Sequence, residues 1–110
     1  MALQTLAPNS DTETILKVMD RDGAAIIADV LPDSMCTRFS DEAMPHINAT
    51  PMGHDEFTGV HTQRTGALVA RSPTCREIIL NKTIVDSARG FLAPFTERMI
   101  LHLTQTIYIH

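Results

Sequence analysis

The sequence predicts an α+β protein in which helices occupy most of the chain and one clear strand closes it. Up to about residue 92, capping signals precede apolar residues spaced three and four apart, which is typical of amphipathic helices. Residues 101–110 instead alternate apolar and polar side chains, which predicts a half-buried strand. The two or three strands expected are too few for a barrel or a sandwich. We therefore expect these 110 residues to be the front part of a larger sheet protein.

The first expected elements are a loose, flexible arm over residues 1–9 and a helix that follows it. Ser10 lies three residues before Glu13, as in a capping box, and Gly23 suits the end of this helix. Residues 24–30 form an apolar run after that glycine, which predicts a short buried strand. The apolar face of the helix would carry Ile15, Leu16 and Met19.

A second helix is expected to begin near Pro32, because proline suits the first helical turn. Pro45 predicts that this helix kinks or ends near that residue, since proline has no amide hydrogen to donate. Residues 48–61 are polar and rich in glycine and proline, which predicts a loop that a ligand could order. The apolar stripe of the helix would be formed by Cys36, Phe39, Ala43 and Ile47.

Two further short helices are expected before the closing strand. The dipeptide Ser72-Pro73 is an N-cap followed by proline at the first helical position, and Asn81 suits the end of that helix. Thr83 and Asp86 have capping-box spacing and open another helix, which Pro94 ends.

The final strand is expected to begin near Met99 and to leave an unpaired backbone edge. Gln105 falls on its apolar face, where a buried amide must be hydrogen-bonded. It is therefore either a satisfied core glutamine or a side chain that lines a pocket. The apolar face also carries Leu101, Leu103, Ile107 and Ile109, and the opposite face carries a polar row of His102, Thr104, Thr106, Tyr108 and His110. That row faces either solvent or a polar cavity.

Composition argues against several classes of function. With a net charge of −4 and no basic run, the chain lacks the footprint of a nucleic-acid or anionic-membrane binder. Cys36 and Cys75 are far apart and have no zinc-site spacing, which favours free thiols. The N-terminus lacks a signal peptide, and no apolar run approaches the roughly 20 residues of a membrane helix. We expect a soluble cytoplasmic protein.

Two groups of residues could carry chemistry. His54, Asp55, Glu56 and His61 resemble the two-histidine, one-carboxylate set that binds non-heme iron. All four lie in one short loop without a rigid scaffold, so we expect ordinary surface residues rather than a metal site. Arg64 and Arg71 flank a small apolar segment, where an arginine needs a carboxylate or phosphate partner. That partner is either a ligand or one of the acidic side chains of the chain itself.

A series of short motifs, taken in order, supplies a more specific reading. They are DEFTG at residues 55–59, TQRTGAL at 62–68, RSP at 71–73 with RE at 76–77, FLAP at 91–94 and LHLTQ at 101–105. Asp22 and Gly23 precede an apolar segment in the same order. Together these motifs resemble the phytanoyl-CoA dioxygenase (PhyH) family, and in particular its fungal members that oxidise meroterpenoids and related natural products.

The resemblance implies a double-stranded β-helix (jelly-roll) barrel with N-terminal helices, of which this chain would hold the helices and the first strands. It also implies Fe(II), 2-oxoglutarate and O2 as cofactors and co-substrates. The iron motif of the family is His-x-Asp, which in relatives follows the strand that here is residues 101–110. A second His and an Arg that binds 2-oxoglutarate come later. Neither His54 nor His110 matches that motif, so no metal-binding or catalytic residue is assigned, and neither cofactor is expected to bind fully to this chain alone.

One cofactor contact is implied within the chain. Relatives carry a basic residue upstream of the iron motif that reaches a carboxylate of 2-oxoglutarate, and by local pattern it falls on Arg64. Gln105 and Thr104 are weaker candidates, on the strand that would line the barrel near the co-substrate.

The resulting hypothesis is the N-terminal part of an Fe(II)/2-oxoglutarate-dependent dioxygenase of secondary metabolism. It would hydroxylate, desaturate or rearrange a small apolar, terpenoid-like substrate. The alternative is a truncated, non-catalytic chain that acts as a structural or regulatory partner through its C-terminal strand. Either form is expected to associate with another copy as a homodimer or through that strand.

Overall fold

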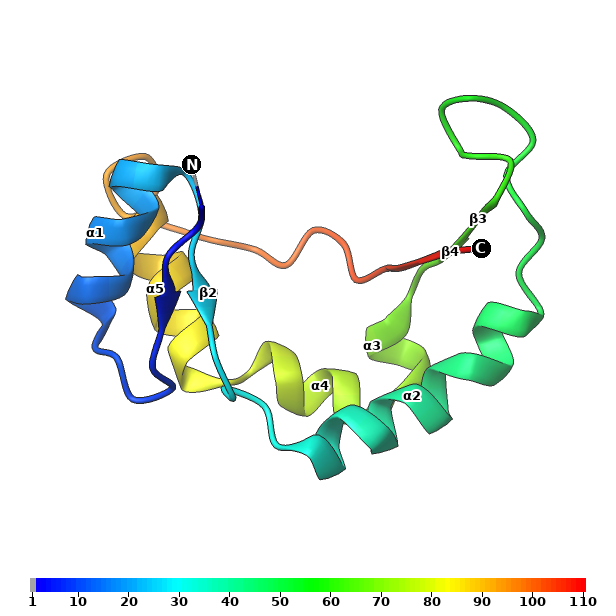
Figure 1. The fold of residues 1–110 in the computed structure, drawn as a ribbon, viewed down its shortest axis with the longest axis horizontal. Helices are drawn as coiled ribbons and strands as arrows, with labels where there is room; N and C mark the ends of the chain where they lie inside the picture. The colour runs from blue at the N-terminus through cyan, green and yellow to red at the C-terminus, as the bar shows by residue number, and fades with distance from the viewer. Residues whose placement is uncertain (1) are drawn as a thin grey trace. The chain divides into compact units, whose positions relative to one another are not determined.

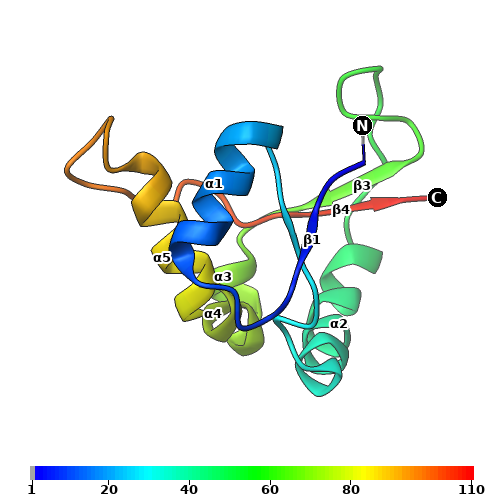
Figure 2. The same cartoon turned by 60° about the vertical axis from the view of Figure 1, so that its left-hand side comes forward.

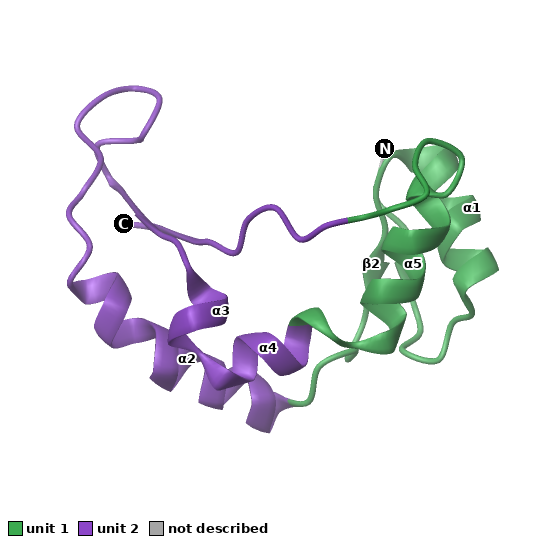
Figure 3. Ribbon diagram, turned by 180° about the vertical axis from the view of Figure 1, so that it is seen from behind, with its two compact units in different colours: residues 1–32, 79–99 green, residues 33–78, 100–110 purple. Residues whose placement is uncertain are grey.

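The computed structural model describes residues 2–110 and contains five helices and four short strands within that range. The chain forms two compact units, one from residues 1–32 and 79–99 and the other from residues 33–78 and 100–110 (Figure 3). Each sheet has two strands and neither closes on itself, so the jelly-roll barrel stays a prediction, as does the assignment of one PhyH-like domain. None of the helices within residues 2–110 has the length and apolar character needed to cross a membrane.

The first unit packs helix α1 (Thr12–Asp22) against helix α5 (Lys82–Leu92), beside a small parallel sheet of β1 (Thr5–Leu6) and β2 (Ile26–Ile27) (Figure 1). Gly90 allows the close approach of the two helices, because a side-chain carbon there would lie 2.7 Å from Leu16 Cδ1. The buried core of this unit consists of Leu6, Ile15 and Val18.

The small parallel sheet changes two predictions in this unit, a loose arm over residues 1–9 and a strand over residues 24–30. The expected arm is not loose throughout, because Thr5–Leu6 pairs with Ile26–Ile27 and Leu6 is buried. Residues 24–30 do not form one buried strand, since only Ile26 and Ile27 pair in the ladder and Ile26 remains exposed. Pairing with so short a strand limits the ladder to two residues.

Helix boundaries in this unit follow local side-chain chemistry. Asp11, one residue after the predicted Ser10, caps α1 by accepting a hydrogen bond from the Thr14 amide at 2.7 Å. Gly23 ends the helix with φ +78°, as predicted for a left-handed C-cap. Asn81 begins α5 rather than ending the preceding helix, because its side chain accepts from the Thr83 and Ile84 amides. The expected capping box at Thr83 is therefore wrong.

The second unit is built on α2 (Asp33–Asn48), whose buried face includes Ala43 and Ile47. The helix was predicted to kink or end near Pro45; it continues past the proline and ends at Asn48, and the Ala49 amide donates to the Pro45 carbonyl at 3.2 Å. Cys36 lies on the exposed side of this helix, not in the expected apolar stripe.

Strand β3 (Thr62–Thr65) pairs antiparallel with β4 (Thr106–Ile109), and the two lie side by side in Figure 2. The closing strand thus begins at Thr106, seven residues later than predicted, because β3 offers only four partner residues. It is paired along one edge, contrary to the expected bare strand. Gln105 lies outside the strand and is exposed, so its predicted place on a buried apolar face is wrong.

Two short helices, α3 (Leu68–Arg71) and α4 (Pro73–Ile79), follow β3. The predicted N-cap at Ser72 is confirmed, since its hydroxyl group accepts a hydrogen bond from the Cys75 amide at 2.9 Å. Cys75 is buried, and that burial raises the pKa of its thiol. Both cysteines are free, as expected from their spacing.

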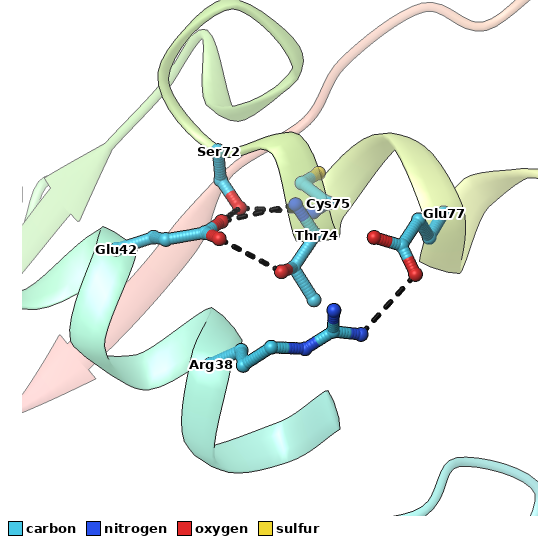
Figure 4. A network of polar contacts seen from close by, with 6 residues as sticks. All are labelled: Arg38, Glu42, Ser72, Thr74, Cys75 and Glu77. Atoms are coloured by element: carbon cyan, nitrogen blue, oxygen red, sulfur yellow. Dashed lines mark hydrogen bonds and ion pairs between the residues drawn. The ribbon is translucent and has the colours of Figure 1, made fainter. Parts of the chain in front are cut away.

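A polar network joins these short helices to α2 (Figure 4). Glu42 points at Ser72 and Thr74, and its carboxylate accepts from both hydroxyl groups and from the Thr74 amide at 2.5–3.0 Å. Ser72 is fully buried, so the carboxylate satisfies polar groups that water does not reach. Closer to the start of α2, Arg38 pairs with Glu77 at 3.2 Å.

Candidate functional site

The candidate site lies on one side of the β3–β4 ribbon. Side chains alternate along β3, so Gln63 and Thr65 are buried on one face while Thr62 and Arg64 belong to the other. Arg64 is directly opposite Ile107 in the antiparallel register, so these two side chains share a face. The ribbon therefore separates a buried polar face from a face that carries the predicted carboxylate-binding arginine.

The buried face anchors β3 to the end of α2. The Gln63 side-chain amide donates to the carbonyl groups of Ile47 and Thr50 at 2.9 and 2.6 Å. Its oxygen lies 2.7 Å from Nε2 of His110, which ties β4 to the same point. Thr50 and Thr65 also share a hydrogen bond between their hydroxyl groups at 2.7 Å. A buried amide with three partners fixes the position of the strand, and thus of Arg64.

Arg64 was predicted from the sequence as a site residue, and Gln63 was not. The buried, hydrogen-bonded glutamine expected at position 105 is found instead at position 63. The signal that could have found it is the strand alternation of Thr62–Thr65, which puts Gln63 and Thr65 on a common face.

The opposite face borders a pocket of about 210 Å³. It is lined by residues 50–54 together with Thr58, Thr62 and Arg64. The lining combines the guanidinium group of Arg64 with hydroxyl groups and apolar side chains such as Met52. A guanidinium group in a small pocket with both polar and apolar walls is suited to bind one end of an anionic ligand.

The loop over residues 53–62 contributes Gly53, His54, Thr58 and Thr62 to the lining of this pocket. No helix or strand lies between the end of α2 and β3, where a loop over residues 48–61 was predicted. The two ends of the 53–62 loop meet where the Gly53 amide donates to the Thr62 carbonyl at 2.9 Å. A side-chain carbon at Gly53 would lie 2.4 Å from the Gly59 carbonyl oxygen, so only glycine fits this approach. Gly59 itself has φ +83°, which favours glycine. The loop is therefore closed by its own backbone contacts.

A tight turn within the loop is held by Asp55 and Thr58. Oδ1 of Asp55 accepts from both the amide and the hydroxyl group of Thr58, each at 2.6 Å. The Thr58 hydroxyl oxygen in turn accepts from the His54 and Asp55 amides at 3.1 and 3.3 Å. The hydrogen bonds from Thr58, first its hydroxyl group and then its amide, lower the pKa of Asp55 and keep it ionised at neutral pH.

Arg64 is exposed, and its Nε donates to the Thr58 carbonyl oxygen at 3.1 Å. Within residues 2–110, no carboxylate lies within 4.0 Å of its guanidinium group, and neither Nη atom donates to the protein. The guanidinium group is thus oriented through Nε while its two terminal nitrogen atoms stay available. In the described part of the chain, Arg64 does not form the structural ion pair that was its alternative.

The other two predicted cofactor contacts lie elsewhere. The Thr104 hydroxyl and carbonyl groups accept from the backbone amides of Val69 and Leu68 at 3.3 and 3.4 Å, so Thr104 holds the start of α3. Gln105 is exposed, and neither residue lines the pocket beside Arg64. Their roles toward a cofactor stay predictions.

The histidines and carboxylates around His54 do not form a metal-binding group. His54 lies 3.4 Å from Asp55 and is strongly exposed, while the His61 carbonyl accepts from the His110 amide. Between Ala2 and His110, no three His, Cys, Asp or Glu side chains are grouped closely enough to hold a metal ion. The described residues therefore do not fit Fe(II), and no metal-dependent step is assigned to them.

No family model matches the chain. Among curated proteins, the chain is 32% identical over 79 residues to "Dioxygenase swnH2" of the fungus Arthroderma benhamiae. The alignment covers 70% of this chain but 25% of that protein, so the chain spans about a quarter of the length of its relative. A continuous stretch of that size within 110 residues must include the segment from Gly53 to Arg64. The aligned stretch therefore includes the loop and Arg64.

Proposed function

We propose that this chain contributes to an Fe(II)/2-oxoglutarate-dependent dioxygenase of the PhyH type, in which Arg64 binds a carboxylate group of 2-oxoglutarate. The similarity to a fungal dioxygenase supports the general class. The observation that carries the specific role is the guanidinium group of Arg64, which is held through Nε and has both Nη atoms available at a pocket.

The chemistry of this arrangement favours a carboxylate ligand. Two terminal N–H groups of a guanidinium match the two oxygens of a carboxylate, and this pairing is stronger than a neutral hydrogen bond. A pocket of about 210 Å³ is small, so it suits the end of a short dicarboxylate better than a whole terpenoid. The role of Arg64 is to bind and orient the co-substrate.

The remaining parts of the active site belong to the same proposal. Fe(II), for which the described residues of this chain provide no ligand set, would supply the activation of O2 in the proposed enzyme. The proposed substrate is a small apolar, terpenoid-like molecule of secondary metabolism. The part of this chain suited to contact it is a set of exposed apolar side chains: Met52, which lines the pocket, and Phe57 and Val60 of the 53–62 loop.

The test measures 2-oxoglutarate affinity in the protein expressed from its complete gene. Arg64→Ala should weaken binding roughly 100-fold, because it removes a charged, bidentate partner. Arg64→Lys should be intermediate, since an ammonium group keeps the charge and loses the fork. Arg71→Ala is the matched control, an exposed arginine at the other end of the same segment, and should change the affinity less than about twofold. Unchanged affinity in Arg64→Ala would reject the proposal.

A second candidate function rests on a different observation. Within residues 2–110, β4 pairs with β3 along one edge and has no partner along the other, and Ile107 and Ile109 are 51% and 73% exposed. Such an edge can pair with another strand. This favours the alternative of a non-catalytic chain that associates through its C-terminal strand.

A further inference from the structure

We infer that Asp55 and Thr58 are positioning residues for Arg64, whose turn orients the guanidinium group before a carboxylate arrives. This inference rests on the proposed function and adds two residues to it. Thr58 lines the pocket, but the effect inferred for both residues is exerted through the Thr58 carbonyl oxygen, which accepts from Arg64 Nε.

The turn is well suited to hold that carbonyl oxygen in place. Four hydrogen bonds connect Asp55, Thr58 and the His54 amide, and they satisfy the Thr58 amide and hydroxyl group completely. The Gly59 amide also donates to the Asp55 carbonyl at 2.8 Å, which closes the turn behind Thr58. With these bonds in place, the Thr58 carbonyl cannot rotate away from Arg64 without breaking several contacts.

The rest of the loop prevents the turn from moving as a body. The Gly53 backbone packs against the Thr58 and Gly59 backbone, with no room for a side chain between them. The Thr62 amide donates to the Gly59 carbonyl at 2.9 Å, which connects the turn directly to the start of β3. Arg64 is two residues further along the same strand, so the donor and the acceptor are fixed on one rigid piece.

Holding the Arg64 side chain in place before the ligand binds should increase the affinity for 2-oxoglutarate. A long arginine side chain loses rotamer freedom when it binds a ligand, and that loss weakens binding by roughly three- to tenfold. A side chain already held through Nε has lost much of this freedom beforehand. Releasing the turn should therefore weaken 2-oxoglutarate binding by about that factor while leaving the charge of Arg64 intact.

The experiment uses the protein expressed from its complete gene and measures the dissociation constant of 2-oxoglutarate. Asp55→Ala and Thr58→Val should each weaken binding roughly three- to tenfold. Asp55→Asn keeps an oxygen acceptor and Thr58→Ser keeps the hydroxyl group, so each should retain most of the affinity. Glu56→Ala is the matched control, because it removes an exposed carboxylate from the same loop and should have no effect.

A double-mutant comparison separates positioning from a merely structural role. In an Arg64→Ala background, Thr58→Val should cause no further loss of affinity, because the residue acts only through Arg64. An additional loss of the same size in that background would overturn the inference. So would unchanged affinity in both Asp55→Ala and Thr58→Val while Arg64→Ala weakens binding. Unchanged affinity in Arg64→Ala itself points instead to failure of the proposed function.

Discussion

The carboxylate of Glu42 in α2 accepts a hydrogen bond of 2.5 Å from the hydroxyl group of Ser72, at the junction of α3 and α4. The same carboxylate accepts from Thr74 through both its amide and its hydroxyl group. One side chain thus satisfies the polar groups at the start of α4 and joins them to the long helix. Because α3 directly follows β3 and Gly66-Ala67, this junction also restrains the strand that carries Arg64.

The Glu42 network predicts a pH dependence of stability. Hydrogen bonds from Ser72, followed by those from the Thr74 amide, lower the pKa of Glu42 in the folded protein. Its stabilising contribution is therefore complete above the ordinary pKa of a glutamate and is lost as the pH falls through the lowered folded value. Urea unfolding between about pH 5 and pH 3 should show a smaller loss of stability on acidification in Glu42→Gln than in the wild type.

The control for this measurement is Asp41→Asn, at the exposed neighbouring position of α2. This variant should follow the pH dependence of the wild type. If Glu42→Gln also follows it, the carboxylate of Glu42 does not contribute to the acid sensitivity of the fold.

Gln63 should contribute more than Gln105 to the stability of the second unit. Gln63→Leu removes two buried hydrogen bonds to the end of α2 and one to His110, and should lower the free energy of unfolding by about 1–3 kcal/mol. Gln105→Leu, at an exposed position outside β4, should change it by less than about 0.5 kcal/mol. Chemical denaturation of both variants measures the difference, and a larger effect at position 105 would contradict the structure.

Two loop glycines should respond differently to the same substitution. Gly53→Ala places a methyl group 2.4 Å from the Gly59 carbonyl oxygen, a backbone atom that cannot easily move, and should cost about 1–3 kcal/mol. Gly66→Ala meets nothing within 4 Å and should be neutral or slightly stabilising. Thermal unfolding of the two variants provides the comparison. Equal melting temperatures would mean that the 53–62 loop is not closed as described.

The 110-residue chain should associate through residues 99–110, since the free edge of β4 and its exposed isoleucines are unprotected. Light scattering should detect species larger than a monomer, and Ile109→Lys should shift the distribution towards the monomer. Leu80→Lys is the matched control, because Leu80 is 74% exposed and Ile109 is 73% exposed. A wild type that stays monomeric, or an equal response to both lysines, would exclude association through this strand.

Local chemistry allowed several elements to be predicted from the sequence. Gly23 ends a helix because a left-handed C-cap depends only on the backbone conformation of that residue and its near neighbours. Ser72 begins one because its hydroxyl group reaches an amide three residues away. The polar, glycine-rich segment before β3 is a loop, as its composition indicates. Arg64 was predicted to bind a carboxylate because it is an arginine next to an apolar segment. In the structure its two terminal nitrogen atoms make no hydrogen bond to the described residues.

Errors arose where two signals of similar local strength competed. Asn81 could end one helix or begin the next, and its side-chain hydrogen bonds to Thr83 and Ile84 decide for the beginning. Pro45 was expected to kink or end α2 nearby, and the helix continues past the proline as far as Asn48. Burial of Ala43 and Ile47 on both sides of the proline outweighs the one hydrogen bond that proline removes.

The sequence by itself determined where apolar and polar residues alternate, where several helices are capped and which arginine is suited to bind a carboxylate. These properties depend on neighbours within a few positions. The tertiary structure alone decided how much of the alternating C-terminal segment becomes a strand, since a ladder extends only as far as its partner β3. It also decided that the buried glutamine is Gln63, and that the Asp55–Thr58 turn lies against Arg64. Hydrogen bonds between segments far apart in the chain require both partners in place, and no local pattern specifies that pairing.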